Sequence, residues 1–377
     1  MDNIFDFADE LGPSKITHIY EPSVGLKGIL VIDNIAVGPS IGGLRIAPDV
    51  SVEECVRLAR AMTLKNAAAG LPHGGGKMVI YGDPKMPKQQ KELMVRAAAA
   101  SLRNQEAYIF GPDMGTNEEC MAWVRDENGR SVGLPRELGG IPLDEIGATG
   151  WGVFHATEIA LRNQNFDLGS ARIVIQGFGS VGKHCARFLT QKGAIVIAAN
   201  DSRGTIFDPE GLDVSALFEL KQQGHSVVDY DNGEQLDKDA IVDIECDIWI
   251  PAARPDVING NNAHRLQTKL VVEGANIPIT KKAEQMLYER GITCIPDFIA
   301  NAGGVICAAM EYHGATQTAA MQTIAEKVAG NTETVLKIAA EENIQPRDAA
   351  IRMATERVKK AMSVRRWSLF SSAPHYI

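Results

Sequence analysis

The sequence has no apolar run long enough to cross a bilayer and no excess of positive charge. A transmembrane helix needs about 20 consecutive apolar residues, and the 377 residues contain no such stretch. The formal net charge is −9, which argues against nucleic acid as the main partner. The first ten residues are acidic and lack the pattern of a signal peptide. We therefore expect a soluble, cytoplasmic protein that binds neither nucleic acid nor membrane.

Cysteine is scarce and scattered. The six cysteines form no C-x-x-C pair and show no spacing typical of a zinc site. Free thiols in a reducing compartment are therefore expected, and no metal site is predicted. Internal repeats and low-complexity tracts are also lacking. A length of 377 residues with ordinary globular composition instead predicts two domains.

The first half of the chain has the pattern of an α/β domain. Residues 17–47 alternate β-branched and apolar residues with Gly and Pro, which predicts a β-meander. Ser51 begins a capping pattern, and the apolar spacing that follows predicts a helix over 51–69. Strands are predicted at 78–82 and 107–113, with a helix between them.

Two lysines flank a triple glycine after the first predicted helix. Lys65 lies on the helix face that carries Leu58 and Met62, so we expect it to point inward or into a cleft. The glycines at 74–76 remove side chains just before Lys77, which would let another molecule approach. A snorkelling lysine beside a flexible turn would explain either lysine alone. Together they favour a pocket that uses one lysine to hold an anion and the other for acid–base chemistry.

Asp113 ends a predicted strand and precedes a helix that we expect to be capped by Thr116 and Glu119. Loops between strands and helices often carry catalytic groups in α/β proteins. An Asx-turn role would explain Asp113 equally well when it is considered alone. Residues 133–150 are rich in Gly and Pro and predict a connection between domains.

The second half has the pattern of a dinucleotide-binding fold. A strand over 171–176 runs directly into a glycine-rich turn and a helix, and Asp201 ends the next strand. Asp201 lies about 20 residues beyond the turn, the offset of an acid that binds the ribose hydroxyls of NAD. Arg203 could accommodate the 2′-phosphate of NADP, and a tight turn without a ligand is the structural alternative. The predicted cofactor-binding turn consists of Gly177, Phe178, Gly179, Ser180, Val181 and Gly182.

Three further apolar strands follow, at 246–253, 269–276 and 292–297, with helical segments between them. This spacing is typical of a doubly wound parallel sheet. The predicted fold class is therefore α/β, with a Rossmann-type second domain.

On these motifs the chain resembles the Glu/Leu/Phe/Val dehydrogenases, a family of amino acid dehydrogenases, over about residues 28–315. The resemblance implies an N-terminal α/β domain for substrate binding and oligomerisation over 1–142. It also implies an NAD-binding Rossmann domain over 143–330, and C-terminal helices over 331–377 that pack back on the first domain. The motifs that carry the resemblance are Gly42-Gly-Leu-Arg45, Met62-Thr-Leu-Lys65, Gly74-Gly-Gly-Lys77, Pro112-Asp-Met-Gly-Thr116, Ala148-Thr-Gly150, the glycine-rich turn, Glu273-Gly-Ala-Asn276 and Pro296-Asp-Phe-Ile-Ala-Asn-Ala-Gly-Gly-Val305.

The resemblance also implies roles for single residues. Lys65 would bind the α-carboxylate of the substrate, and Lys77 would be the catalytic lysine that activates water. Asp113 would handle the proton of the amine. A homo-oligomer is expected. The other implied contacts are Gly42 in the substrate site, Thr149 and Ala252 beside the cofactor, Asn276 beside the nicotinamide and Asn301 in the cleft.

The side-chain pocket is where the sequence departs from the glutamate branch of the family. Glutamate dehydrogenases place a lysine that grips the side-chain carboxylate where this chain has Ile41, and a serine where it has Ala308. Met62, three residues before Lys65, is shared with the leucine and phenylalanine branches. An apolar pocket would leave a γ-carboxylate desolvated and unpaired. The predicted substrate is therefore an apolar L-amino acid.

The predicted reaction is the reversible, NAD-dependent oxidative deamination of an amino acid of the Leu, Val, Ile or Phe type to the 2-oxo acid and ammonia. NADP is not excluded as the cofactor. One alternative is a glutamate dehydrogenase that holds the γ-carboxylate with His73 or Arg45, and the Rossmann half looks closer to that branch. Another is a non-catalytic nucleotide-sensing protein built on the same fold.

Overall fold

The structure, a computed structural model, describes residues 4–364, which form two compact units. Unit 1 contains residues 4–142, 305–320 and 352–364, and unit 2 contains 143–304 and 321–351. The sequence-based domains place 305–320 with the Rossmann half instead. No Gly- or Pro-rich linker marks these later boundaries, because each of them falls inside a helix. The last part of the predicted C-terminal segment, 365–377, lies outside the described residues.

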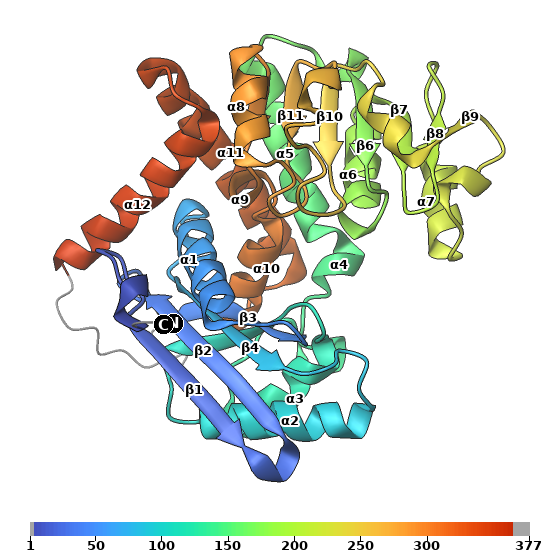
Figure 1. Ribbon diagram of the computed structural model, residues 1–377. Helices are drawn as coiled ribbons and strands as arrows, with labels where there is room; N and C mark the ends of the chain where they lie inside the picture. The colour runs from blue at the N-terminus through green and yellow to red at the C-terminus, as the bar shows by residue number, and fades with distance from the viewer. Residues whose placement is uncertain (1–3, 365–377) are drawn as a thin grey trace. The chain divides into compact units, whose positions relative to one another are not determined.

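Unit 1 is built on a five-stranded mixed sheet in the order β1-β2-β4-β3-β5 (Figure 1). The predicted meander is wrong, because β4 lies between β2 and β3 and pairs in parallel with β3. A helical crossover, α1, carries the chain from β3 to β4, and an alternating sequence pattern does not reveal which strands will pair. The strands are β1 (Lys15–Glu21), β2 (Leu26–Asn34), β3 (Ser40–Ala47), β4 (Gly74–Tyr81) and β5 (Tyr108–Pro112).

Helices cover both faces of this sheet, with α1 (Val52–Ala68) on one face and α2 (Lys88–Ser101) and α3 (Glu118–Asn128) on the other (Figure 1). The Ser51 side chain accepts the Glu54 N–H, so the predicted start of α1 is confirmed. The cap of α3 is Asn117 rather than Thr116. The larger core lies under α2 and α3 and includes Leu30, Ile32, Leu44, Ile46, Met78 and Ile80.

The face under α1 holds the smaller core and the charged residues. Val31 and Val79 pack there against Cys55 and Ala59 of α1. Residues two apart on a strand share a face of the sheet. Lys77 therefore lies on the α1 face, beside Val79.

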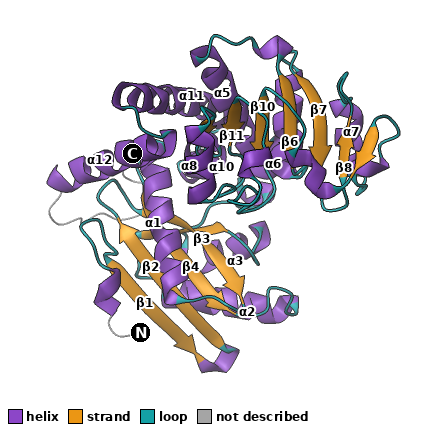
Figure 2. Cartoon of the chain, turned by 45° about the horizontal axis from the view of Figure 1, so that its top comes forward, coloured by secondary structure: helices purple, strands orange, loops and turns teal. Residues whose placement is uncertain are grey.

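Unit 2 has a seven-stranded sheet in the order β12-β11-β10-β6-β7-β8-β9, and Figure 2 shows its strands side by side with helices against them. The first five strands in this order are parallel, and β8 and β9 extend the sheet in antiparallel fashion. The predicted doubly wound sheet is therefore confirmed. The strands are β6 (Arg172–Gln176), β7 (Ile195–Asn200), β8 (Thr205–Phe207), β9 (Glu234–Leu236), β10 (Ile248–Pro251), β11 (Leu270–Val272) and β12 (Thr293–Ile295).

The order of the parallel strands reverses at β6, which has β7 on one side and β10 on the other. Open α/β sheets bind ligands at such a reversal, outside the carboxyl ends of the strands. The helices of this unit are α4 (Leu143–Ile146), α5 (Ala148–Asn163), α6 (Ser180–Thr190), α7 (Val214–Gln222), α8 (Lys281–Glu289) and α9 (Asp297–Ala300).

Three C-terminal helices complete the chain: α10 (Gly303–Tyr312), α11 (Gln317–Glu342) and α12 (Pro346–Val364). The second part of α12 belongs to unit 1, where Arg357 donates to the carbonyls of Ala67, at 2.7 Å, and Leu71, at 3.0 Å. Of the predicted C-terminal segment 331–377, residues 352–364 therefore lie with unit 1, whereas residues 331–351 belong to unit 2 and not to the first domain. None of the helices in the described part of the chain is both long and apolar enough to cross a membrane. All six cysteines are buried and free.

Candidate functional site

A partly buried charge network lies on the α1 face of the sheet in unit 1. The Nζ of Lys77 is 2.6 Å from Oδ2 of Asp113, and the Lys77 side chain is 7% exposed. Arg45 donates to the same oxygen from Nε at 3.0 Å and to Glu54 from Nη1 at 2.5 Å. Burial raises the pKa of Asp113, but the charges of Lys77 and Arg45 lower it by more, so this pKa lies below its ordinary value. Asp113 is therefore an ionised carboxylate shared by two cations.

Glycines bring these groups together. A Cβ on Gly43 would lie 2.7 Å from Cβ of Asp113 and 3.1 Å from Nζ of Lys77, so a side chain there would crowd the pair. A Cβ on Gly75 would lie 2.0 Å from the backbone nitrogen of Thr63, which means that α1 rests directly on β4. The other two glycines of the triplet also meet protein atoms at less than 3 Å. The triplet thus packs the chain against itself, and the expected approach of another molecule to it is wrong.

Five of the predicted substrate residues are distributed over three elements of unit 1, whereas Asn276 and Asn301 belong to unit 2. Ile41 is 4% exposed and pairs with Gly75, and it shares its face of β3 with Gly43. Ile41 therefore lies on the same side of the sheet as Lys77, whereas Gly42 faces the opposite side. On α1, Met62 and Lys65 are half-buried, and on α10, Ala308 is buried.

Neither of the two alternative cations is available to a side-chain carboxylate in the arrangement described. Arg45 already contacts Asp113 and Glu54. His73 is 1% exposed, and its ring nitrogens lie 3.0 Å from the carbonyl of Pro39 and 3.1 Å from Nε2 of His313. Burial lowers the pKa of His73 to about 4, so its imidazole is neutral at pH 7.

In unit 2, the glycines of the turn between β6 and α6 have three different surroundings. Gly177 has φ +97°, and a Cβ there would lie 2.5 Å from Cβ of Ala253. A Cβ on Gly182 would lie 2.0 Å from the carbonyl oxygen of Gly177, so this glycine lets the helix pack on the turn. A Cβ on Gly179 would meet nothing within 4 Å. The space at Gly179 is therefore open to a ligand, as a pyrophosphate requires.

The start of α6 fits an anion. Its cap, Gly179, has no side chain that could accept the first N–H groups of the helix, and these groups with the helix dipole favour negative charge. Ser180 is exposed, and its Oγ lies 3.2 Å from Oδ1 of Asp144, while Phe178 is buried. The residues present therefore fit a dinucleotide whose phosphates would be held by backbone groups.

Loops that follow neighbouring strands meet beside this turn. A Cβ on Gly274 would lie 3.1 Å from Cγ1 of Val181 and 3.4 Å from Cβ of Ala252. Asn301 is 3% exposed and donates to Oδ1 of Asn276 at 3.0 Å. Thr149 lies in the first turn of α5, where its Oγ1 is 3.1 Å from the Cβ position of a glycine of α10. The structure thus brings together the predicted cofactor residues that follow β6, β10 and β11.

Asp201 has more partners than the sequence suggests. Its oxygens accept from Nζ of Lys221 at 2.8 Å, from Oγ of Ser226 at 2.8 Å and from the backbone N–H groups of Arg203 at 2.9 Å and Val227 at 3.0 Å. Burial raises the pKa of Asp201, but these donors lower it by more, to about 2. Ribose hydroxyls would have to share an oxygen with these donors, and the ribose-binding role of Asp201 stays a prediction.

Sequence reasoning missed two charged groups. Glu54 lies in the capping pattern that begins at Ser51, yet it also holds Arg45. Arg347, at the start of α12, contacts three carboxylates in unit 2. The only signal in the sequence is its position after Pro346, which predicts a helix start but no partner.

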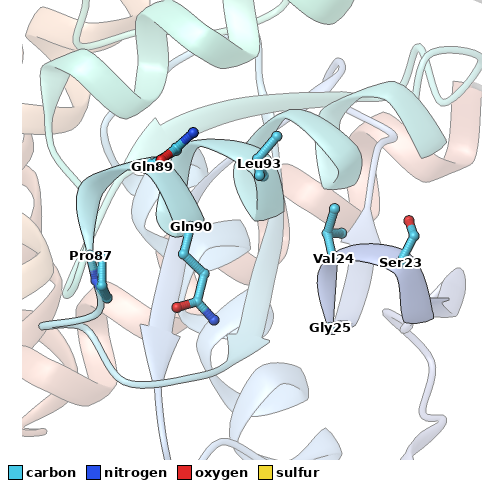
Figure 3. Close-up of a pocket in the computed structure, with 7 residues that line it drawn as sticks. All are labelled: Ser23, Val24, Gly25, Pro87, Gln89, Gln90 and Leu93. Atoms are coloured by element: carbon cyan, nitrogen blue, oxygen red, sulfur yellow. The ribbon is translucent and has the colours of Figure 1, made fainter.

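A pocket of 490 Å³ lies elsewhere in unit 1, where the 3₁₀ turn η2 (Pro22–Val24) meets the start of α2 (Figure 3). None of the predicted site residues lines it, and its lining has no charged side chain. It is therefore not the candidate site. Among residues 4–364, no three His, Cys, Asp or Glu side chains are grouped so that they could hold a metal ion. The pocket is lined by Ser23, Val24, Gly25, Pro87, Gln89, Gln90 and Leu93.

The sequence and the fold are similar to those of known proteins. Residues 139–366 match the family described as Glutamate/Leucine/Phenylalanine/Valine dehydrogenase, and residues 16–130 match its dimerisation domain. The chain is 38% identical to an NADP-specific glutamate dehydrogenase of Saccharolobus shibatae, over 74% of this chain and 69% of that one. It is 35% identical to a catabolic NAD-specific glutamate dehydrogenase of Bacillus subtilis, over 89% and 83%. A leucine-bound crystal structure of the hetero-hexameric glutamate dehydrogenase of Thermus thermophilus is similar with a TM-score of 0.82 and 28% identity, covering 95% of this chain and 91% of that one.

Proposed function

Since the chain belongs to the Glu/Leu/Phe/Val dehydrogenase family, a family of amino acid dehydrogenases, we propose that it catalyses the reversible oxidative deamination of an apolar L-amino acid to the 2-oxo acid and ammonia. The observation that carries the apolar preference is the position of Ile41. This buried, uncharged side chain shares a face of the sheet with Lys77 and Asp113. Because Arg45 and His73 are engaged elsewhere, the described arrangement offers a γ-carboxylate no counter-ion from these positions.

The chemistry follows from the Lys77–Asp113 pair. A nicotinamide dinucleotide, when bound, supplies the hydride acceptor for the substrate Cα. Lys77 and Asp113, 2.6 Å apart, can pass a proton between them while the amine becomes an iminium and water adds to it. The ammonium of Lys65 would hold the α-carboxylate. Arg45 keeps Asp113 ionised, so that Asp113 accepts protons from Lys77 or the substrate.

The proposed cofactor is NAD, with NADP not excluded. The open space at Gly179 and the uncapped start of α6 support a dinucleotide of either kind. NAD-specific and NADP-specific relatives have similar identities to this chain. Arg203 is exposed and pairs with Asp229 at 2.7 Å, so a 2′-phosphate would compete with that carboxylate. We further propose a homo-oligomer, because residues 16–130 match a dimerisation domain.

The second candidate is glutamate, favoured by the names of the relatives. The two candidates are separated by a double variant, Ile41→Lys with Ala308→Ser, which adds a cation and a hydroxyl to the predicted side-chain pocket. We expect kcat/KM for glutamate relative to leucine to rise by about 100-fold, since a buried carboxylate then gains a partner. Ile351→Lys adds the same charge at a partly exposed isoleucine of unit 2 and should leave the ratio unchanged. A wild-type enzyme that already prefers glutamate would refute the apolar assignment.

A further inference from the structure

The first turn of α12 places a guanidinium among three carboxyl groups of unit 2. Arg347 contacts both oxygens of Glu273 from Nη2, at 2.8 and 3.0 Å, and Asp297 from Nη1 at 2.9 Å. Its Nε contacts Glu284 at 2.6 Å. Glu273 is fully buried, and the side chains of Glu284 and Asp297 are 4% and 9% exposed. Removing one partner from such a group leaves buried charges unpaired.

Two of these carboxylates reach the loops beside the predicted cofactor site. Glu273 directly follows β11 and starts the segment that ends at Asn276. Asp297 starts α9, and its Oδ2 accepts the backbone N–H of Ile277 at 2.9 Å. The third carboxylate, Glu284, belongs to α8 and contacts neither loop through a described hydrogen bond of its side chain.

Ile277 has a backbone conformation that its side chain disfavours. Its φ is +48°, in the left-handed region, where a β-branched residue is a strained exception. Its side chain does not secure the turn by burial, since Ile277 is 51% exposed. The Ile277 backbone is held instead by two hydrogen bonds, from its N–H to the Oδ2 of Asp297 and from the N–H of Asp256 to its carbonyl at 3.0 Å.

The residue before this strained turn is Asn276. Asn276 is exposed, and its Oδ1 accepts from Asn301 at 3.0 Å. It follows β11, on the edge of the sheet where open α/β folds bind ligands, and the same loop touches Val181 of the glycine-rich turn through Gly274. The Asn276 side chain is therefore held by Asn301 and adjoins a strained turn that hydrogen bonds of the Ile277 backbone hold in place.

We propose that Arg347 is a positioning residue for the reaction, which orients Asn276 toward the ligand by holding Asp297 against the strained turn at Ile277. This inference rests on the proposed function, because it assumes that Asn276 faces a bound substrate or cofactor. Arg347 itself contacts neither. Its fork geometry matters as well as its charge, since it holds two loops and α8 from three different nitrogens.

The test begins with Arg347→Lys, which keeps the charge and loses the fork. We expect kcat to fall on the order of 100-fold, the cost of a displacement of about 1 Å in a reacting complex, while the KM values change by less than about threefold. Ile277→Gly should leave wild-type kcat nearly unchanged, because glycine adopts a positive φ without strain. In the double variant with Arg347→Lys, Ile277→Gly should raise kcat at least tenfold above that of Arg347→Lys alone. The reason is that a turn with glycine no longer needs hydrogen bonds to hold it.

Two matched controls separate positioning from stability. Asn343→Gly replaces another residue with positive φ in unit 2, at φ +53°, and should not restore kcat in Arg347→Lys. Glu284→Gln weakens the same buried cluster without touching the turn, and should lower the melting temperature while leaving kcat within about twofold. Two results would each mean that Arg347 acts only on stability, and either would overturn the proposal. One is that Asn343→Gly restores the kcat of Arg347→Lys as well as Ile277→Gly does, and the other is that Glu284→Gln lowers kcat as much as Arg347→Lys.

Hydrogen exchange provides a readout that needs no substrate. In Arg347→Lys, the Ile277 amide should exchange at least tenfold faster than in the wild type, with strand β6 unchanged. Asp297→Asn should give the same result if Arg347→Lys does not fold. Unchanged exchange at Ile277 would overturn the proposal. Wild-type protein that turns over no amino acid, but shows the expected exchange, would instead refute the proposed function and leave the Arg347–Asp297–Ile277 link intact.

Discussion

The two units differ in the kind of residue that each places at its expected ligand site. Unit 1 gathers charge: Lys77, Asp113 and Arg45 form a partly buried network on one face of a mixed sheet. Unit 2 removes side chains: Gly179 leaves open space at the uncapped start of α6. The first arrangement suits proton transfer, which needs ionisable groups in contact. The second suits phosphate binding, which needs backbone N–H groups and room. Substitutions in unit 1 should therefore change turnover, and those in the turn of unit 2 should change cofactor affinity.

The strongest test of this contrast is Lys77→Ala. We expect kcat to fall by about 10²–10⁴-fold, because the acid–base partner of Asp113 is lost. The dissociation constant for the dinucleotide should stay within about twofold of the wild type. Lys88→Ala is the matched control, since Lys88 also pairs with a carboxylate of unit 1 but is 68% exposed. Steady-state kinetics and a fluorescence titration measure both quantities, and a Lys77→Ala enzyme with normal turnover would remove Lys77 from the mechanism.

The second prediction concerns the acid stability of unit 1. Burial lowers the pKa of His73 from 6.5 to about 4, so between these values the unfolded chain binds a proton that the folded chain does not. The contribution of neutral His73 to the free energy of unfolding is therefore fully present above pH 6.5. It falls as the pH drops, by about 3 kcal/mol at pH 4. His73→Gln should flatten this part of the curve of unfolding free energy against pH. Urea titrations from pH 4 to 7.5 would measure it, and equal slopes in the two proteins would contradict the assignment.

The dependence of the unfolding free energy on pH also allows the two units to be compared, because unit 2 has a histidine whose pKa is likewise lowered by burial. The pKa of His184 is lowered to about 4 by burial and by the neighbouring Arg187 and Lys183. His184→Gln should therefore remove a different part of the acid sensitivity, without affecting the His73–His313 contact. If the two units unfold separately, each variant should alter only its own transition.

The smallest effect is expected from a pair of glycines in unit 2. Gly179→Ala should fold normally, because its Cβ meets no protein atom within 4 Å, and should weaken dinucleotide binding about tenfold. Gly182→Ala places a Cβ 2.0 Å from the Gly177 carbonyl oxygen and should lower the free energy of unfolding by about 1–3 kcal/mol. Calorimetry of binding and of thermal unfolding would separate the two. If Gly179→Ala binds the dinucleotide normally, the phosphates do not approach this glycine.

The sequence predicted those parts of the molecule that depend on local pattern. The cap at Ser51, the turn after β6 and the parallel sheet of unit 2 follow from residue spacing. Strand pairing in unit 1 does not, because β4 enters between β2 and β3 after a helical crossover. The packing role of the triplet glycines was also hidden, since it depends on how closely α1 approaches β4.

The candidate site shows the same limit. Lys77 and Asp113 were predicted separately, and their contact at 2.6 Å depends on the pairing of β3 with both β4 and β5. The four donors around Asp201 come from three segments after β7, and the three carboxylates around Arg347 come from three separate segments of unit 2. Contacts of this kind join residues that are distant in the chain, so no local sequence pattern predicts them.

The central claim is tested most directly by the initial rates of NADH formation by the wild-type enzyme with leucine, valine, isoleucine, phenylalanine and glutamate. The account predicts that kcat/KM for the best apolar substrate exceeds that for glutamate by at least 100-fold, because a γ-carboxylate beside Ile41 would be desolvated without a partner. A higher kcat/KM for glutamate would contradict this account of the side-chain pocket.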